Sequence, residues 1–343
     1  MPAFADLAFV NGSVLTVDAR FTIASALAVT GDTITAVGGR GEIDALTGPD
    51  TRVIDLKGGT LLPGINDSHL HGCAFGVSSP PLALDLGHPA VGSIADVAEA
   101  VREAAERTPT GQWITGVGWD AGYLAECVAD PSRLPTRHDL DVVSPHHPVL
   151  LQDFSGHACW VNSAALARAG VDRATTTPPG GVIVTDVSGE PTGLLQEGAQ
   201  VCVQRVLPPL TREARATAIR STLAKLRALG ITSYTEPGLG PGGEQIMGGA
   251  LAGETLDVYR QLLADGELTA RVSVLLLPVG MSGTATEFIR ALRGTDVPAS
   301  EDPRRLNVIG VKLFADGIPP NKTAWMHEAY LGGGCGALCV GVG

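Results

Sequence analysis

The chain has 343 residues, 44% of them hydrophobic, which is enough to build the cores of two ordinary domains. Its net charge of −12 at pH 7 argues against a nucleic-acid partner, because phosphate binding needs clustered lysine and arginine. It contains no run of about 18 apolar residues. We therefore expect no membrane-spanning helix and no membrane partner.

The start of the chain and its cysteines indicate a cellular compartment. The first 20 residues lack the basic start and long apolar core of a signal peptide, so we expect a cytoplasmic protein. Six cysteines are scattered along the chain and, without a secretion signal, are expected to be reduced thiols. Cys335 and Cys339 form a C-x3-C pair, but no second pair follows to complete a structural zinc site.

Residues 1–60 predict a small β-domain. Asn11-Gly12, between the apolar runs of "LAFVNGSVLTV", is the strongest short hairpin signal in this region. Gly31-Asp32 repeats the pattern within residues 24–38. The chain leaves this domain at "LLPGIND".

Residues 80–208 predict a mixture of helices and strands. Ser93 can cap an amphipathic helix over residues 93–108. Residues 112–120 and 147–158 read as strands, and a short helix ends at Gly170. Residues 180–197 predict a hairpin that turns at Ser188-Gly189.

After residue 208 the pattern becomes β-α-β-α-β. It begins with a long helix that Thr211 can cap and Gly230 ends. The strands that follow are apolar on both faces, which is typical of a parallel sheet covered by helices. The predicted elements are a strand at 231–236, a helix at 254–266, a strand at 271–278, a helix at 285–294 and a strand at 306–317.

The run "GGTLLPGINDSHLH" supplies a further strand ahead of these, so that four parallel strands follow one another, with residues 80–208 inserted after the first. Polar residues collect at the carboxyl ends of two of them, His69 and His71 on one, Lys312 and Asp316 on the other. In a (β/α)8 barrel, active sites lie at this end.

His69 and His71 are the first candidate ligands. Alternate side chains of a strand project to one face, so two imidazoles two residues apart can form half of a metal site. A pair of hydrogen-bonded core histidines is the alternative. Lys312 lies inside an apolar run, and a buried lysine normally has a partner. For Asp316, a turn role and a site role both remain open.

Five motifs in a fixed order carry a resemblance. They are "LLPGINDSHLH", "DFSGHACWVNSAAL", "EPTGLLQEGA", "LGITSYTEPG" and "VKLFADG". The chain resembles the amidohydrolase superfamily, and within it the amidohydrolase 3 branch of N-substituted formamide deformylase-like metal-dependent hydrolases.

The resemblance implies an α/β fold, a metal-dependent hydrolase TIM-type (β/α)8 barrel of which the first half is present. It also implies a small N-terminal β-sandwich domain that is composite with a later part of the family's chain. The expected parts are the β-sandwich at 1–60, the first barrel strand and metal-binding loop at 61–79, an inserted α+β segment at 80–208, and barrel strands two to four at 209–343.

For the chemistry, the resemblance implies that His69, His71 and a carbamylated Lys312 hold one or two divalent metal ions, with zinc as the default. A carbamate offers two anionic oxygens, whereas a free ammonium is a poor ligand. A metal-activated hydroxide would then hydrolyse a non-peptide C–N bond, in an amide, N-formyl or N-acyl small molecule. His157 and Asp316 would contact the substrate.

The family pattern also needs two histidines after strands five and six and an aspartate after strand eight, and none of these occurs here. We therefore expect an incomplete form of the enzyme. Four strands would leave the last with an unpaired apolar edge, which allows a homo-oligomer.

Two other functions remain as alternatives. One is a catalytically inactive fragment or remnant of the family. The other is a dinucleotide-binding oxidoreductase, since Gly238, Gly240 and Gly243 match G-x-G-x-x-G after a strand. Pro237 and Pro241 interrupt that turn, however, and the next residues are a poor start for the required helix.

Overall fold

A computed structural model describes residues 4–280, 283–294, 299–316, 324–331, 333–336 and 338. The chain divides into two compact units, Met1–Asn66 and Asp67–Gly343. This division falls six residues beyond the end of the N-terminal domain expected at residue 60.

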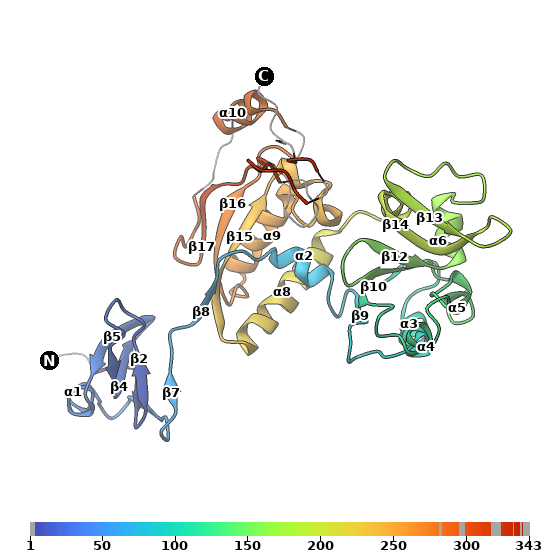
Figure 1. Ribbon diagram of the computed structural model, residues 1–343. Helices are drawn as coiled ribbons and strands as arrows, with labels where there is room; N and C mark the ends of the chain where they lie inside the picture. Colours follow the sequence, from blue (N-terminus) through green and yellow to red (C-terminus); the bar gives the residue numbers. More distant parts are fainter. Residues whose placement is uncertain are drawn as a thin grey trace. The chain divides into compact units, whose positions relative to one another are not determined.

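The N-terminal unit is built from two small sheets (Figure 1). One has the strand order β5-β4-β1-β6 and the other β3-β2-β7. Small apolar side chains, among them Ala8, Ala26 and Ala28, pack with Ile43 of the short helix α1 (Arg40–Asp44). The strands are β1 (Leu7–Val10), β2 (Ser13–Leu15), β3 (Ile23–Ala24), β4 (Ala26–Thr30), β5 (Thr33–Gly38), β6 (Arg52–Asp55) and β7 (Thr60–Leu61).

The two predicted hairpins of this unit have different outcomes. The one at Gly31-Asp32 is confirmed, because β4 and β5 pair antiparallel and Gly31 has φ +61°. The one at Asn11-Gly12 is wrong. Strand β1 pairs with β4 and β6, while β2 pairs with β3 and β7, so the turn carries the chain from one sheet to the other. A side chain at Gly12 would clash with the Gly59 carbonyl, which accounts for glycine there.

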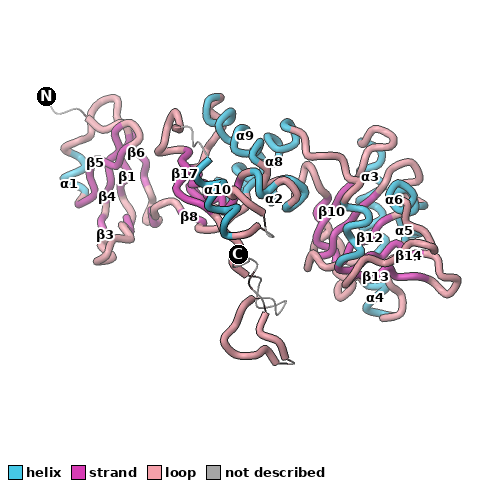
Figure 2. Tube along the Cα trace, turned by 90° about the horizontal axis from the view of Figure 1, so that it is seen from above, coloured by secondary structure: helices cyan, strands magenta, loops and turns pink. Residues whose placement is uncertain are grey.

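The first part of the second unit contains a six-stranded sheet in the order β13-β14-β12-β11-β10-β9 (Figures 1 and 2). Strands β9, β10 and β11 are parallel, and β11, β12, β14 and β13 are joined antiparallel. The strands are β9 (Leu84–Asp85), β10 (Ile114–Trp119), β11 (Val149–Asp153), β12 (Ala158–Val161), β13 (Gly181–Thr185) and β14 (Pro191–Glu197). The helices are α3 (Ile94–Arg107), α4 (Ala125–Ala129), α5 (Arg137–Asp141), α6 (Ser163–Ala169) and α7 (Val201–Gln204), the last preceded by the 3-10 turn η1 (Gly198–Gln200).

Helix ends in this region follow the predicted capping residues. The Ser93 hydroxyl accepts a hydrogen bond from the Asp96 N–H at the start of α3. Helix α6 ends at Gly170, which is left-handed with φ +66°. The hairpin at Ser188-Gly189 is confirmed by the antiparallel pairing of β13 with β14.

Another sheet has the order β17-β16-β15-β8, and the boundary between the two units falls within β8. Strands β15, β16 and β17 are parallel, and α9 and α10 connect them in sequence, which confirms the predicted β-α-β-α-β pattern. The elements are β8 (Ile65–Asp67), α2 (Gly72–Val77), α8 (Arg212–Ala228), β15 (Ile231–Leu239), α9 (Gly253–Ala264), β16 (Arg271–Leu276), α10 (Ala285–Gly294) and β17 (Leu306–Val311).

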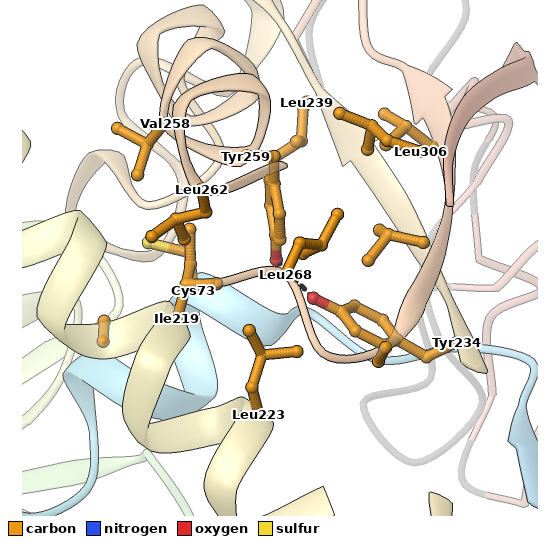
Figure 3. Packing of buried hydrophobic residues seen from close by; sticks show 14 of the residues in the cluster. Cys73, Ile219, Leu223, Tyr234, Leu239, Val258, Tyr259, Leu262, Leu268 and Leu306 are labelled. Atoms are coloured by element: carbon orange, nitrogen blue, oxygen red, sulfur yellow. Dashed lines mark hydrogen bonds between the residues drawn. The ribbon is translucent and has the colours of Figure 1, made fainter. Parts of the chain in front are cut away.

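One core cluster joins this sheet to its helices. It combines Ile219 and Leu223 of α8, Val258 and Leu262 of α9, and Tyr234 of β15 (Figure 3). Aliphatic residues on the two helices recur at helical spacing toward the sheet, so their burial removes one stripe of each helix from water.

The dinucleotide-binding alternative is not supported by the segment after β15. The glycines at 238, 240 and 243 are followed by two 3-10 turns, η2 (Pro241–Gly243) and η3 (Ile246–Gly249), and α9 begins only at Gly253. Within this described segment no α-helix begins directly after the glycines, where its N-terminus would bind a pyrophosphate. Among the described residues, none of the helices is both long and apolar enough to cross a membrane.

Candidate metal centre

His69 and His71 follow β8 but do not lie on it. The strand ends at Asp67, His69 lies in a bend, and His71 is the residue before the first turn of α2. The expectation that strand alternation brings the two rings together is therefore wrong. They converge because the chain turns from strand to helix between them.

The two imidazole rings nevertheless contact each other. Their centroids are 5.5 Å apart and their planes meet at 85°. The His69 side chain is exposed, and its backbone N–H donates to the Asp67 carboxylate at 3.0 Å. The Asp67 side chain thereby holds the bend that turns the chain toward His71.

A buried carboxylate holds His71. Glu236 of β15 is 1% exposed, and its Oε1 accepts a hydrogen bond from His71 Nδ1 at 2.9 Å. Its Oε2 accepts from the Gly72 N–H at 2.8 Å and from the Tyr259 hydroxyl at 3.2 Å. Three donors therefore compensate the removal of this carboxylate from water.

Two tyrosines extend this contact into the core. The Tyr234 and Tyr259 hydroxyls point toward each other, 2.7 Å apart, among the aliphatic side chains shown in Figure 3. Burial, followed by nearby negative charge that includes Glu236, raises the pKa of each tyrosine well above its usual value. Burial, and then the charge of Glu236, raises the pKa of Cys73 to about 12. Burial therefore favours the neutral thiol of Cys73.

Helix α2 is fixed against α8. The Thr222 hydroxyl donates to the Gly72 carbonyl at 2.7 Å. A side chain at Gly76 would clash with the backbone of Ala218, so glycine lets the two helices approach closely. These contacts place the start of α2, and with it His71.

Lys312 directly follows β17, and its backbone N–H donates to the Leu276 carbonyl at 2.7 Å. Its ammonium lies 4.8 Å from the centre of the Phe314 ring, and a Cβ at Gly238 would lie 3.5 Å from its Cγ. It is thus at the carboxyl ends of β15, β16 and β17. No hydrogen bond or ring contact joins it to either histidine within the described ranges, and its role as a ligand remains a prediction.

Asp316 and His157 have other partners. The Asp316 carboxylate accepts from the Trp325 N–H at 2.9 Å. His157 lies before β12 and its Nδ1 is 2.9 Å from Glu197 Oε2, at the end of β14. This hydrogen bond, and then the charge of Glu197, raises the pKa of the exposed His157. In the part of the chain that is described, no hydrogen bond joins either residue to His69 or His71, and their substrate roles stay predictions.

The donor set fits part of a divalent-metal site. His71 has one ring nitrogen fixed by Glu236, and its other nitrogen has no hydrogen-bond partner among the described residues. His69 presents a second imidazole beside it. Within the same residues, no group of three or more His, Cys, Asp or Glu side chains could hold a metal ion. The two histidines thus supply two imidazole ligands, and a site with more ligands would need other groups such as Lys312.

The sequence alone does not mark Glu236 as a site residue. Its partner in the fold is 165 residues away in the chain, and although Glu236 lies within the motif "LGITSYTEPG", that motif assigns no role to a single glutamate inside a strand. The available signal was its place, since "ITSYTE" ends a strand of the same sheet whose carboxyl edge was expected to hold the site.

Comparison with known proteins agrees with this architecture. The model of the amidohydrolase family matches residues 52–341. Over 199 residues the chain is 38% identical to the N-substituted formamide deformylase of Arthrobacter pascens. This alignment covers 58% of this chain and 35% of the deformylase. Over 282 residues it is 32% identical to YtcJ of Bacillus subtilis, covering 82% of this chain and 48% of YtcJ.

A solved structure shows the same likeness. An uncharacterized metal-dependent hydrolase from Pyrococcus furiosus superposes with a TM-score of 0.68 and 26% identity, over 97% of this chain and 61% of that one. The chain thus spans about half the length, or less, of the two curated relatives named above. By the extent of the family match, this chain belongs to the amidohydrolase family.

Proposed function

We propose that the protein is a metal-dependent amidohydrolase that hydrolyses a non-peptide C–N bond, in an amide, N-formyl or N-acyl small molecule. His69, His71 and a carbamylated Lys312 would hold one or two divalent ions, zinc first among them. The observation that carries the proposal is the histidine pair, with rings 5.5 Å apart and His71 anchored by a buried glutamate, in a chain of this family.

The chemistry divides between metal and protein. A bound divalent ion would lower the pKa of a water molecule and polarise the carbonyl of the substrate. His69 and His71 supply neutral imidazoles for it. Lys312 becomes a ligand only when its ammonium has lost a proton, the resulting amine has added carbon dioxide, and the carbamic acid has lost a second proton, which converts a cation into an anion with two donor oxygens. His157 and Asp316 are proposed to contact the substrate.

The bond class rests on likeness rather than on a described pocket. One relative bears the name N-substituted formamide deformylase, and the chain covers 35% of it. Formamides are therefore the first substrates to test. An inactive form of the family is the competing function, and turnover decides between the two.

Metal binding tests the site directly. We expect the purified protein to contain about one or two equivalents of zinc per chain. His69→Ala and His71→Ala should each lower the zinc affinity by at least tenfold, because each removes one ligand. His146→Ala is the control, since His146 is an exposed residue away from the predicted motifs. Unchanged zinc content in both histidine variants would refute the site.

Turnover tests the lysine. Lys312→Ala should abolish hydrolysis of N-substituted formamides, and short carboxylic acids should restore part of it by replacing the carbamate. Lys225→Ala is a matched control, because the Lys225 ammonium also lies over a phenylalanine ring, at 5.1 Å from the centre of Phe75. Full activity in Lys312→Ala would exclude the bridging role. Absence of any turnover in the zinc-loaded protein would favour the inactive form.

A further inference from the structure

The contacts of Glu236 determine the protonation of His71. A carboxylate has acceptors only, and Glu236 already accepts two hydrogen bonds on Oε2, from the Gly72 N–H and the Tyr259 hydroxyl. Its Oε1, 2.9 Å from His71 Nδ1, therefore accepts a hydrogen bond from a protonated Nδ1. In the neutral imidazole this leaves the lone pair on Nε2, which is the atom a metal would bind.

The two histidines are not equivalent in this respect. His71 has a charged, fully buried acceptor on one nitrogen, whereas the His69 side chain has no hydrogen-bond partner among the described residues. Glu236 is itself held by a backbone N–H and by a tyrosine whose ring lies in the core cluster. The position of the His71 ring is thus connected to the packed interior of the sheet and its helices.

We propose that Glu236 is a positioning residue for the metal site, which holds His71 as the Nδ1–H tautomer and so reserves Nε2 for the metal. This inference rests on the proposed function. A carboxylate that accepts from the second nitrogen of a ligating histidine fixes the ring and raises its basicity, and loss of such a partner typically weakens metal binding by about 10- to 100-fold.

The substitution Glu236→Gln separates positioning from packing. Glutamine has the same shape, and its carbonyl oxygen can still accept from the Gly72 N–H and the Tyr259 hydroxyl. Its amide then faces His71 Nδ1 and donates to it, which favours the opposite tautomer, with the proton on Nε2. The variant should keep the fold and have the opposite tautomer of the His71 ring.

The first readout needs no metal. In protein with 15N-labelled histidine, His71 should show a protonated Nδ1 and an unprotonated Nε2, and Glu236→Gln should reverse the two. The wild-type spectrum alone tests the assignment if the variant does not fold. A wild-type His71 with its proton on Nε2 would overturn the inference.

The second readout is zinc affinity, measured against a competing chelator. We expect Glu236→Gln to lose about 10- to 100-fold, and Glu267→Gln, the same change at a surface pair with Arg220, to match the wild type. An unchanged tautomer and affinity in Glu236→Gln, with affinity lost in His71→Ala, would overturn the inference and leave the proposed function standing. Unchanged zinc affinity in His71→Ala would instead overturn the metal site, and with it the role given to Glu236.

Discussion

Site residues in this chain differ in how far away in the sequence their partners lie. This distance decides which residues can be recognised as site residues from the sequence. His69 and His71 stand out because they are two apart in a motif. Glu236 does not, because a buried carboxylate is explained only by donors that the fold brings to it from residues 71, 72 and 259. The sequence thus predicts ligands and misses the group that orients one of them.

His157 offers a pH test at the residue scale. Its hydrogen bond to Glu197 and the charge of that carboxylate raise its pKa in the folded state. The pair therefore stabilises the fold fully below the unfolded pKa of about 6.5, and this contribution is lost as the pH rises through the higher folded value. A histidine NMR titration should place the pKa of His157 above 6.5 and show it falling in Glu197→Gln.

Glu190→Gln is the matched control for this titration, since Glu190 pairs with Arg173 and not with His157. A pKa for His157 that is equal in wild type and in Glu197→Gln would contradict the pairing.

Helix ends are predicted correctly where a capping residue next to the helix determines them. Thr211 caps α8 through a hydrogen bond from the Ala214 N–H, Ser93 caps α3, and Gly170 ends α6, all as the sequence predicts. The chain also bends at Asn11-Gly12, but β1 pairs in parallel with β6, some 45 residues later. A turn signal specifies the bend and carries no information about which distant strand completes the sheet.

Two helix caps should differ in their effect on stability. The buried Asn162 side chain caps α6 by accepting from the Ala165 N–H, and it also accepts from the Val149 N–H and donates to the Ser144 and His147 carbonyls. Asn162→Ala leaves several buried groups unpaired and should cost about 3 to 5 kcal/mol. Ser93→Ala removes one exposed cap and should cost about 1 kcal/mol.

Urea unfolding followed by tryptophan fluorescence measures both costs, because Trp119 and Trp160 pack edge-to-face at 5.9 Å in the same region as the two caps. Equal costs for the two variants would show that the additional hydrogen bonds of Asn162 contribute little.

At the scale of the molecule, the change of hydrophobic periodicity after residue 208 predicts the helix and the β-α-β-α-β order that α8, β15, α9, β16, α10 and β17 follow. The division into parts at residues 60, 79 and 208 stays a prediction.

The three core clusters among the described residues beyond residue 67 each contain buried cysteine, namely Cys73 in one, Cys127 in another, and Cys159 with Cys202 in the third. Each cluster therefore has its own chemical reporter.

Thiol labelling of the buried cysteines should measure the opening of each cluster separately. Burial raises the pKa of Cys73 and Cys159 to about 12, so near pH 8 both are protonated as well as inaccessible. In a Cys335→Ser, Cys339→Ser variant, the native protein should react with a thiol reagent only at the rate of local opening. The exposed Cys335 should react at once when it is present.

Mass spectrometry of partly labelled peptides in rising urea measures the order in which the clusters open. Rapid labelling of Cys73 in native buffer would show that the core beneath the histidine loop is open to solvent.

The close contact of α2 with α8 has a consequence for the entropy of the site. His71 stands at the start of a helix that Gly76 and Gly72 fasten to α8, and its ring is bonded to Glu236. The His71 side chain therefore loses its rotamer freedom when the chain folds. His69 lies in an exposed bend, with a ring contact to His71 and no hydrogen bond from its side chain among the described residues. Binding of a ligand by this pair would therefore restrict mainly the His69 side chain. The loss of rotamer entropy would cost up to about 1 kcal/mol for a side chain of this size. The His71 ring is ordered before a ligand binds, whereas the His69 ring would become ordered on binding.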